Sequence, residues 1–317
     1  MKDEAVAPGI KKKSIKNLLI LSGILVLEFV VLINPSLIKE YKKFERYLPA
    51  ATSTASVTVA NVVPVASSAS LNGESAITLT ENATKSVVVT GTITDSNGCA
   101  DLASVVVKVY KGLLADCTAT DSTTCYVLTI SSPSTDATCT GASDTDIVLS
   151  SSNATFNLEY YAQADSSWKA TITPYDGSGA GTVNTSSGTV VNTLTALSVG
   201  ETISYGTVAN GADSTGDHTA TVKNTGNVAI DYNLSAAADF TCTTLGSIPL
   251  GNNKFGTASF DYSTGGTALT SSPQLVAANI AAKTTTDSTA ASYWQIAVPN
   301  GVSGTCSGSI TFAAAAH

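Results

Sequence analysis

The pattern of apolar and polar positions changes near residue 50. Leu18–Ile33 is a nearly continuous apolar run, interrupted by Ser22, Gly23 and Glu28. After it, apolar residues recur at helical spacing as far as Pro49, namely Leu37, Ile38, Tyr41, Phe44, Tyr47 and Leu48. A three-to-four-residue period is typical of a helix with one apolar face. The pattern therefore predicts an apolar, then amphipathic, α-helix within residues 1–49.

From Ala50 onward the period becomes two, which is typical of β-strands with one buried face. Clusters of Asp, Asn, Ser and Gly separate the alternating segments, as at Asp95–Gly98 and Asn224–Asn227. The segments that alternate, or that we expect as late strands, are Val87–Thr90, Val105–Val109, Phe156–Tyr160, Trp168–Ile172, Val228–Leu234, Tyr293–Val298 and Ser309–Phe312.

Many short strands between turn signals predict a mainly β fold class, with the N-terminal α-helix followed by two immunoglobulin-like β-sandwich domains. We place the N-terminal segment at 1–49, the first sandwich at 50–195 and the second at 196–317. Gly112–Ser152 is poor in apolar residues and carries cysteines. We therefore expect it to be an insertion held by disulfides because it lacks a core of its own.

Charge divides the chain in the same place. Residues 1–49 carry nine basic and five acidic residues, whereas residues 50–317 carry seven basic and 19 acidic ones. An acidic body suits a soluble surface at a cell exterior and does not suit nucleic-acid binding. The 317 residues include only two histidines, so few side chains are available for acid–base catalysis near neutral pH. We therefore expect that the protein is not an enzyme. An anchored hydrolase is the third hypothesis.

The N-terminal segment predicts export. Lys11, Lys12, Lys13 and Lys16 precede the apolar run, which is the order of an export signal or a signal anchor. No small-residue cleavage site follows the run, so simple release by signal peptidase is not favoured. The expected location is extracellular, at the cell surface, with initial anchoring in the membrane by the N-terminal helix.

Glu28 lies inside the apolar run, where a carboxylate is costly. Gly23, four apolar residues and Glu28 resemble the type IV prepilin signature, over about 30 residues of the chain. The resemblance implies cleavage after Gly23 and a new N-terminus at Ile24. It also implies that Glu28 neutralises the amino group of a neighbouring subunit within a filament. A protonated or snorkelling glutamate in a membrane anchor is the other interpretation.

Two stretches resemble extracellular modules. Ser204–Val208 with Thr221–Asn227 resembles the opening strands of bacterial and archaeal immunoglobulin-like surface modules, and Trp168–Asp176 resembles a late strand of cadherin- or PKD-like modules. Each resemblance covers tens of residues. They imply architecture and location, and they carry over no catalytic residue.

The six cysteines divide as four and two between the predicted sandwiches. Even numbers in an exported chain favour disulfides. Cys242 and Cys306 then have only each other, whereas the first domain allows three pairings. Of these we favour Cys117–Cys125 with Cys99–Cys139. A zinc site is the rival interpretation, although no C-x-x-C pair is present.

Other candidate sites are polar. Asp95, Asn97 and Asp101 place oxygen ligands around a Gly turn, which suits Ca²⁺, although an ordinary Asn-Gly hairpin turn explains the same residues. No other cofactor is expected. N-x-[ST] sequons at Asn82, Asn153, Asn184 and Asn233 offer glycosylation sites. His218 is interpreted as structural because no nucleophile motif accompanies it.

Two functions follow from these patterns. The first is a structural subunit of a type IV pilus-like extracellular filament, assembled through the N-terminal helix, with the sandwiches exposed for adhesion. In a variant of it, Ser53–Val65 completes the sheet of a neighbouring copy. The alternative is a membrane-anchored monomeric surface adhesin or cell-wall-layer protein. The expected partners are identical subunits, the membrane during assembly and a surface or cell ligand, but not nucleic acid.

Overall fold

The computed structural model describes residues 53–112, 114, 117–131, 139–141 and 143–317. The chain divides into two compact units, 1–59 and 60–317, and the strands of the described residues all lie in the second. The described residues form β-strands and three short 3-10 turns, η1 (Asn72–Glu74), η2 (Cys99–Asp101) and η4 (Leu250–Asn252), with no α-helix among them. The predicted fold class is therefore wrong in its helical part: the fold is a β-sandwich fold. Residues 1–49, where we expected the helix, lie outside the described residues.

None of the described segments is a helix that is long and apolar enough to span a membrane.

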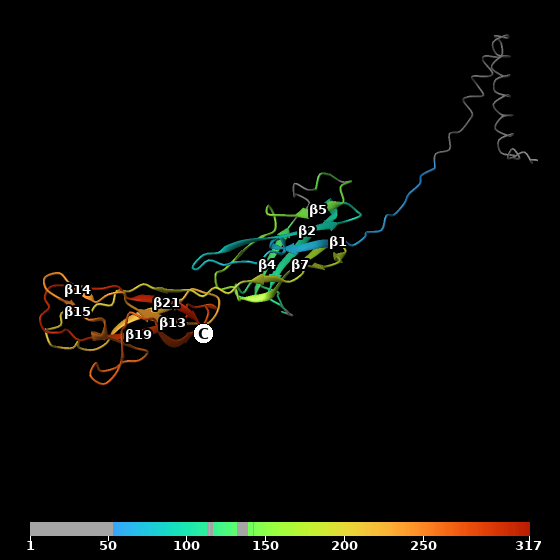
Figure 1. The fold of residues 1–317 in the computed structure, drawn as a ribbon. Coiled ribbons are helices and arrows are strands. Elements are labelled where there is room, and N and C mark those ends of the chain that lie inside the picture. Colours follow the sequence, from blue (N-terminus) through green and yellow to red (C-terminus); the bar gives the residue numbers. More distant parts are fainter. Residues whose placement is uncertain (1–52, 113, 115–116, 132–138, 142) are drawn as a thin grey trace, which may run out of the picture. The chain divides into compact units, whose positions relative to one another are not determined.

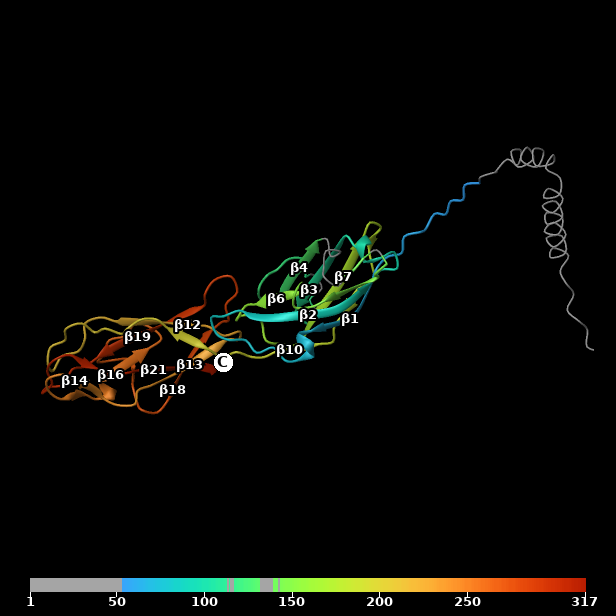
Figure 2. The same ribbon diagram turned by 90° about the horizontal axis from the view of Figure 1, so that it is seen from above.

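The strands before residue 192 form two sheets around one core (Figure 1). One sheet contains β1 (Val65–Leu71), β2 (Lys85–Thr94), β5 (Asp146–Leu149) and β6 (Thr155–Leu158). The other contains β3 (Ser104–Tyr110), β4 (Cys125–Ser131), β7 (Asp165–Asp176), β8 (Gly179–Ala180), β9 (Asn184–Thr185) and β10 (Thr189–Val191). Figure 2 shows β2 and β1 lying across β3, β4 and β7.

Period-two alternation explains this core. Val105, Val107 and Val109 of β3 are fully buried, as are Trp168, Ala170 and Ile172 of β7. β3 and β7 pair antiparallel with Val107 opposite Ile172, so the inward positions of both strands meet the same core. We name the residues of this cluster, from Ala66 to Leu194, the first core.

The expected insertion at Gly112–Ser152 differs from the structure. It contains β4, which pairs with β3 along seven residues, and β5, which pairs with β2. Tyr126 of β4 and Ile147 and Leu149 of β5 are buried in the first core. The apolar residues of this stretch are concentrated in β4 and β5, whose sequences are CYVLTIS and DIVL, so each strand has enough of them to pack against its neighbour.

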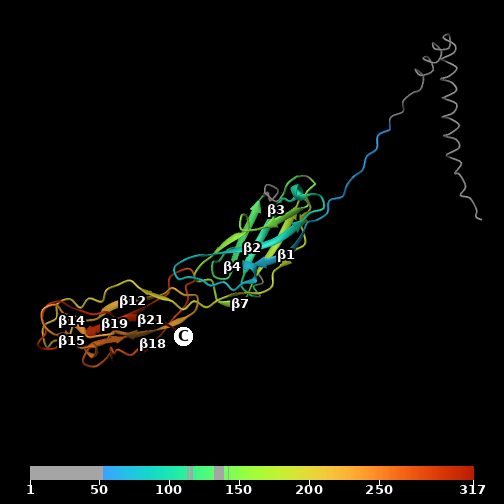
Figure 3. The same ribbon diagram turned by 45° about the horizontal axis from the view of Figure 1, so that its top comes forward.

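The strands after residue 196 surround two further clusters (Figure 3). The five-stranded sheet contains β11 (Leu197–Val199), β12 (His218–Asn224), β19 (Thr289–Ile296), β16 (Asn253–Gly256) and β17 (Thr267–Ala268). It shares the second core with β18 (Gln274–Ile280), β13 (Ile230–Ser235) and β21 (Thr311–Ala316). A small sheet of β15 (Ser247–Ile248), β14 (Phe240–Cys242) and β20 (Cys306–Ser307) carries the third cluster.

The first and second cores lie on either side of the predicted boundary at 195/196. Because both belong to the unit 60–317, that boundary stays a prediction. Asn227 links the two sides: its Oδ1 accepts the Leu194 N–H at 2.7 Å, and its Nδ2 donates to the carbonyl oxygens of Ala162 at 2.9 Å and Asn192 at 3.0 Å.

The structure contains three disulfides, and they are the pairs that we favoured from the sequence. Cys99 pairs with Cys139, Cys117 with Cys125 and Cys242 with Cys306, with Cα–Cα distances of 5.9, 5.5 and 3.8 Å. Cys242 and Cys306 are register partners on β14 and β20, so this bond joins two strands directly.

Candidate metal centre

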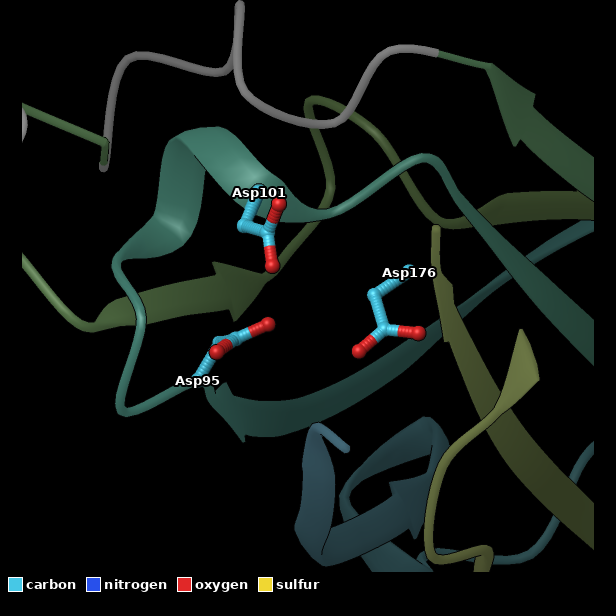
Figure 4. Close-up of side chains that lie close together, drawn as sticks. All are labelled: Asp95, Asp101 and Asp176. Carbon is cyan, nitrogen blue, oxygen red and sulfur yellow. The ribbon is translucent and has the colours of Figure 1, made fainter. Parts of the chain in front are cut away.

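Three carboxylates from three separate segments meet at one end of the first core. Asp95 follows the last residue of β2, Asp101 ends η2, and Asp176 is the last residue of β7. One carboxylate oxygen from each lies within 4.8 Å of the others. Figure 4 shows the three side chains converging on a common space.

The strand pattern explains why two of these side chains face inward. Along β2 the buried series Val87, Val89, Gly91 and Ile93 continues to Asp95. Along β7 the buried series Trp168, Ala170, Ile172 and Pro174 continues to Asp176. In both sheets, therefore, the inward row changes from apolar to acidic at its last member.

Local turns bring Asp101 and Asp176 to Asp95. The Gly98 N–H donates to the Asp95 carbonyl at 3.0 Å and the Asp101 N–H donates to the Gly98 carbonyl at 2.9 Å, so the chain folds back over this turn. Gly98 has φ 108°, a conformation that favours glycine. Ser104 of β3 opposes Tyr175 of β7, which places the end of β7 beside the turn.

Asp95 is fully buried, and its Oδ2 has no hydrogen-bond partner. Its Oδ1 accepts the Asn97 N–H at 2.8 Å. Burial raises the pKa of Asp95, the Asn97 N–H opposes this rise, and the nearby charges of Asp101 and Asp176 add to it. An ionised Asp95 is thus unfavourable here unless a positive charge is near.

Asp176 is 6% exposed but is well supplied with donors. Its Oδ1 accepts the N–H groups of Ser178 at 2.8 Å and Gly179 at 2.9 Å, and its Oδ2 accepts Asn61 Nδ2 at 3.0 Å. Asp101 is exposed. Among the described residues, no salt bridge involves any of the three carboxylates. The arrangement offers hard oxygen ligands, which suit a hard divalent cation.

The structure gives Asn97, a predicted ligand, a different partner. Its Oδ1 accepts the Val62 N–H at 2.7 Å and its Nδ2 donates to the Ala60 carbonyl at 3.4 Å. Asn97 therefore holds residues 60–62, and Asp176 joins Asp95 and Asp101 instead. Asp176 was missed because it lies about 80 residues away in the sequence, although its place at the end of an inward row was a usable signal.

The other predicted site residues are scattered. Gly23, Ile24 and Glu28, which carry the prepilin resemblance, lie outside the described residues. His218 is on β12, where its ring contacts Tyr205 at a centroid distance of 5.1 Å and its buried Nε2 has no hydrogen-bond partner. Asn82 is exposed, whereas Asn153, Asn184 and Asn233 are partly buried.

Comparison with known proteins places the chain in no family. No protein-family model matches it, and no curated protein matches it. Four chains of solved structures match. One of them, titled BspA_C_WT, is 8% identical, covers 76% of this chain and 91% of its own length, and has a TM-score of 0.21. So low a score carries no argument about the fold or the function.

Proposed function

We propose that this chain is an extracellular protein of the cell surface that acts as a structural or adhesive element, in individual copies and without a catalytic centre. The observation that carries the proposal is the state of the cysteines. All six lie among the described residues, all are paired and none is free. Disulfides persist in oxidising compartments and are rare in the cytosol.

The position of the disulfides supports the same conclusion. Cys99 is packed in the first core, and Cys242 belongs to the third cluster. In a reducing compartment these sites would hold six free thiols, and the loops between them would lose their covalent closure. Both parts of the unit 60–317 therefore depend on an oxidising environment.

Surface location can be tested on intact cells that naturally produce the chain. Protease added outside should digest residues 60–317 while a cytosolic control protein survives. Denatured but unreduced protein should take up no maleimide, and reduction should expose six reactive thiols. Survival of the chain while a known surface protein is digested would overturn the proposed location. Free thiols before reduction would overturn the proposed cysteine state.

A second candidate is polymerisation by strand donation, which residues 53–64 favour. This segment forms no strand in the structure. Val57 and Val59 are 85% and 77% exposed, in the alternating order of a strand that lacks a sheet. If donation occurs, negative-stain images of the full chain should show filaments, and V57D/V59D should abolish them. Single particles in the parent protein support the individual copies proposed above.

A further inference from the structure

We propose that Asp95, Asp101 and Asp176 bind Ca²⁺, and that the bound ion fixes the turn that holds residues 60–62. This site is independent of the proposed location. It differs from the sequence-based candidate because Asp176 replaces Asn97 as the third ligand.

The first support is the unsatisfied oxygen. Asp95 Oδ2 is buried and lacks a hydrogen-bond partner, and a buried polar atom without a partner is costly. Asp95 Oδ1 is already engaged by the Asn97 N–H, so Oδ2 is the oxygen left for a ligand. Figure 4 shows one oxygen of Asp95 facing the space between Asp101 and Asp176. A cation in that space would satisfy it.

The second support is the spacing of the three oxygens. Ca²⁺ binds oxygen at about 2.3–2.6 Å, so two ligands of one ion can be at most about 5 Å apart. The three carboxylate oxygens lie within 4.8 Å of one another, which fits one Ca²⁺ shell. Mg²⁺ binds at about 2.1 Å in a strict octahedron, and Zn²⁺ prefers nitrogen and sulfur ligands. Asp101 is exposed, so water can complete a shell of six to eight oxygens.

The third support is the way the site joins the chain around it. Asp95 and Asp101 flank Asn97, whose side chain accepts the Val62 N–H. Asp176 accepts Asn61 Nδ2, and the same nitrogen donates to Ser178 Oγ at 2.7 Å. An ion bound to the carboxylates therefore restrains both groups that hold residues 61 and 62. Without an ion, repulsion among the carboxylates loosens the same contacts.

The test uses the full chain, freed of metal with a chelator and then titrated with CaCl₂ or MgCl₂. We expect Ca²⁺ to bind with a dissociation constant of about 10⁻⁴–10⁻³ M, as in extracellular modules. At a hundredfold excess over that constant, Tm should rise by about 5–10 °C. Amide exchange at Val62 should slow, and Mg²⁺ should have a weaker effect. If Ca²⁺ leaves Tm unchanged, or leaves amide exchange at Val62 unchanged, the proposal is overturned.

Isosteric variants locate the site. In D95N the amide oxygen can still accept the Asn97 N–H, but the charge for the ion is gone, so the Ca²⁺-dependent rise should be lost. The metal-free protein should be at least as stable as the parent, because repulsion is removed. D101N changes an exposed residue and should also abolish the rise, which keeps the test decisive if D95N fails to fold.

D165N is the matched control. Asp165 begins β7 as Asp176 ends it, and its Oδ1 accepts the N–H of the residue two positions later, Ser167, at 2.8 Å. Asp165 is outside the carboxylate cluster, so D165N should keep the full response to Ca²⁺. An unchanged response in both D95N and D101N would place the ion elsewhere and overturn the assignment.

Discussion

Asp95, directly after β2, and Asp176, at the end of β7, each continue an inward row of buried apolar side chains or glycine. Their burial means that a carboxylate, which is rarely buried without a partner, ends the inward row on both sheets. The alternation at Trp168–Ile172, when it is continued with the same period, puts Asp176 on the inner face. What the sequence could not supply was the pairing of β3 with β7, which brings that residue to the turn at Asp95.

At the residue scale, the disulfides should differ in their contribution to stability. The chain separations are 64 residues for Cys242–Cys306, 40 for Cys99–Cys139 and eight for Cys117–Cys125. By loop-closure entropy, C242S/C306S should lower the free energy of unfolding by about 4 kcal/mol and C117S/C125S by about 2.5 kcal/mol. Urea unfolding of each double variant measures the difference. A larger loss from the short loop would contradict the entropic explanation.

A second residue-scale prediction concerns the sequons. Asn82 is exposed in a turn with φ 54°. Asn153 Nδ2 donates to the Val148 carbonyl at 3.3 Å, Asn184 Oδ1 accepts the Ala69 N–H at 2.8 Å, and Asn233 lies in β13 between β18 and β21. In material that carries N-glycans, Asn82 should have the highest occupancy by glycopeptide mass spectrometry, and N82Q should remove it. Occupied Asn233 with bare Asn82 would contradict this accessibility order.

At the element scale, Asp231 supports an irregular pairing. The register between β13 and β18 shifts between Ile230 and Tyr232. Asp231 Oδ1 accepts the N–H of Asn279, a residue with φ 44°, at 2.8 Å. This hydrogen bond lowers the pKa of Asp231, burial opposes the decrease, and His317 adds to it. The carboxylate thus supplies an acceptor that the shifted ladder lacks.

The lowered pKa of Asp231 determines how the stability of the folded protein depends on pH. Because the pKa is lower in the folded protein, the stabilisation is present above the unfolded value of about 3.9 and is lost as the pH falls through the folded value. D231N should lower the free energy of unfolding at pH 7, since an amide oxygen is a weaker acceptor than a carboxylate. The parent and variant should converge near pH 2 in urea unfolding. An equal difference at both pH values would show that the charge is not responsible.

Strands were predictable from the sequence where their own residues alternate between apolar and polar. The alternation at Val105–Val109 and Trp168–Ile172 correctly indicated β3 and β7. β4 and β5 were missed because the apolar residues of 112–152 are concentrated in these two short segments, and an average over the whole stretch conceals them. Asn97 was assigned to the metal site because an amide beside an aspartate offers oxygen, yet the backbone at 60–62 takes its side chain.

At the scale of the whole molecule, Asn227 should couple the two sides of the predicted boundary. It is 3% exposed and serves three backbone groups, at Leu194, Ala162 and Asn192. N227A leaves these groups without their partner and should destabilise the protein by about 3 kcal/mol. We also expect it to separate one calorimetric transition into two, because the first and second cores then unfold independently.

Asn192 provides the control for this prediction. Its side chain donates to Thr78 Oγ1 at 2.9 Å on the exposed surface, so N192A removes one exposed hydrogen bond and keeps the backbone carbonyl that Asn227 binds. N192A should cost no more than about 1 kcal/mol and leave the shape of the transition unchanged. If N227A behaves like N192A, the buried amide does not couple the cores.

The bond between Cys242 and Cys306 also limits how far the chain can be stretched. A fully extended chain spans about 3.5 Å per residue, so a loop closed across 64 residues withholds about 220 Å of contour length from any pulling force. Tension applied at the two ends of the polypeptide passes through the sulfur atoms of β14 and β20 and bypasses the residues between them. Much of the region after residue 196 therefore stays a closed ring even when its sheets have come apart, and it can regain its strands once the load is removed.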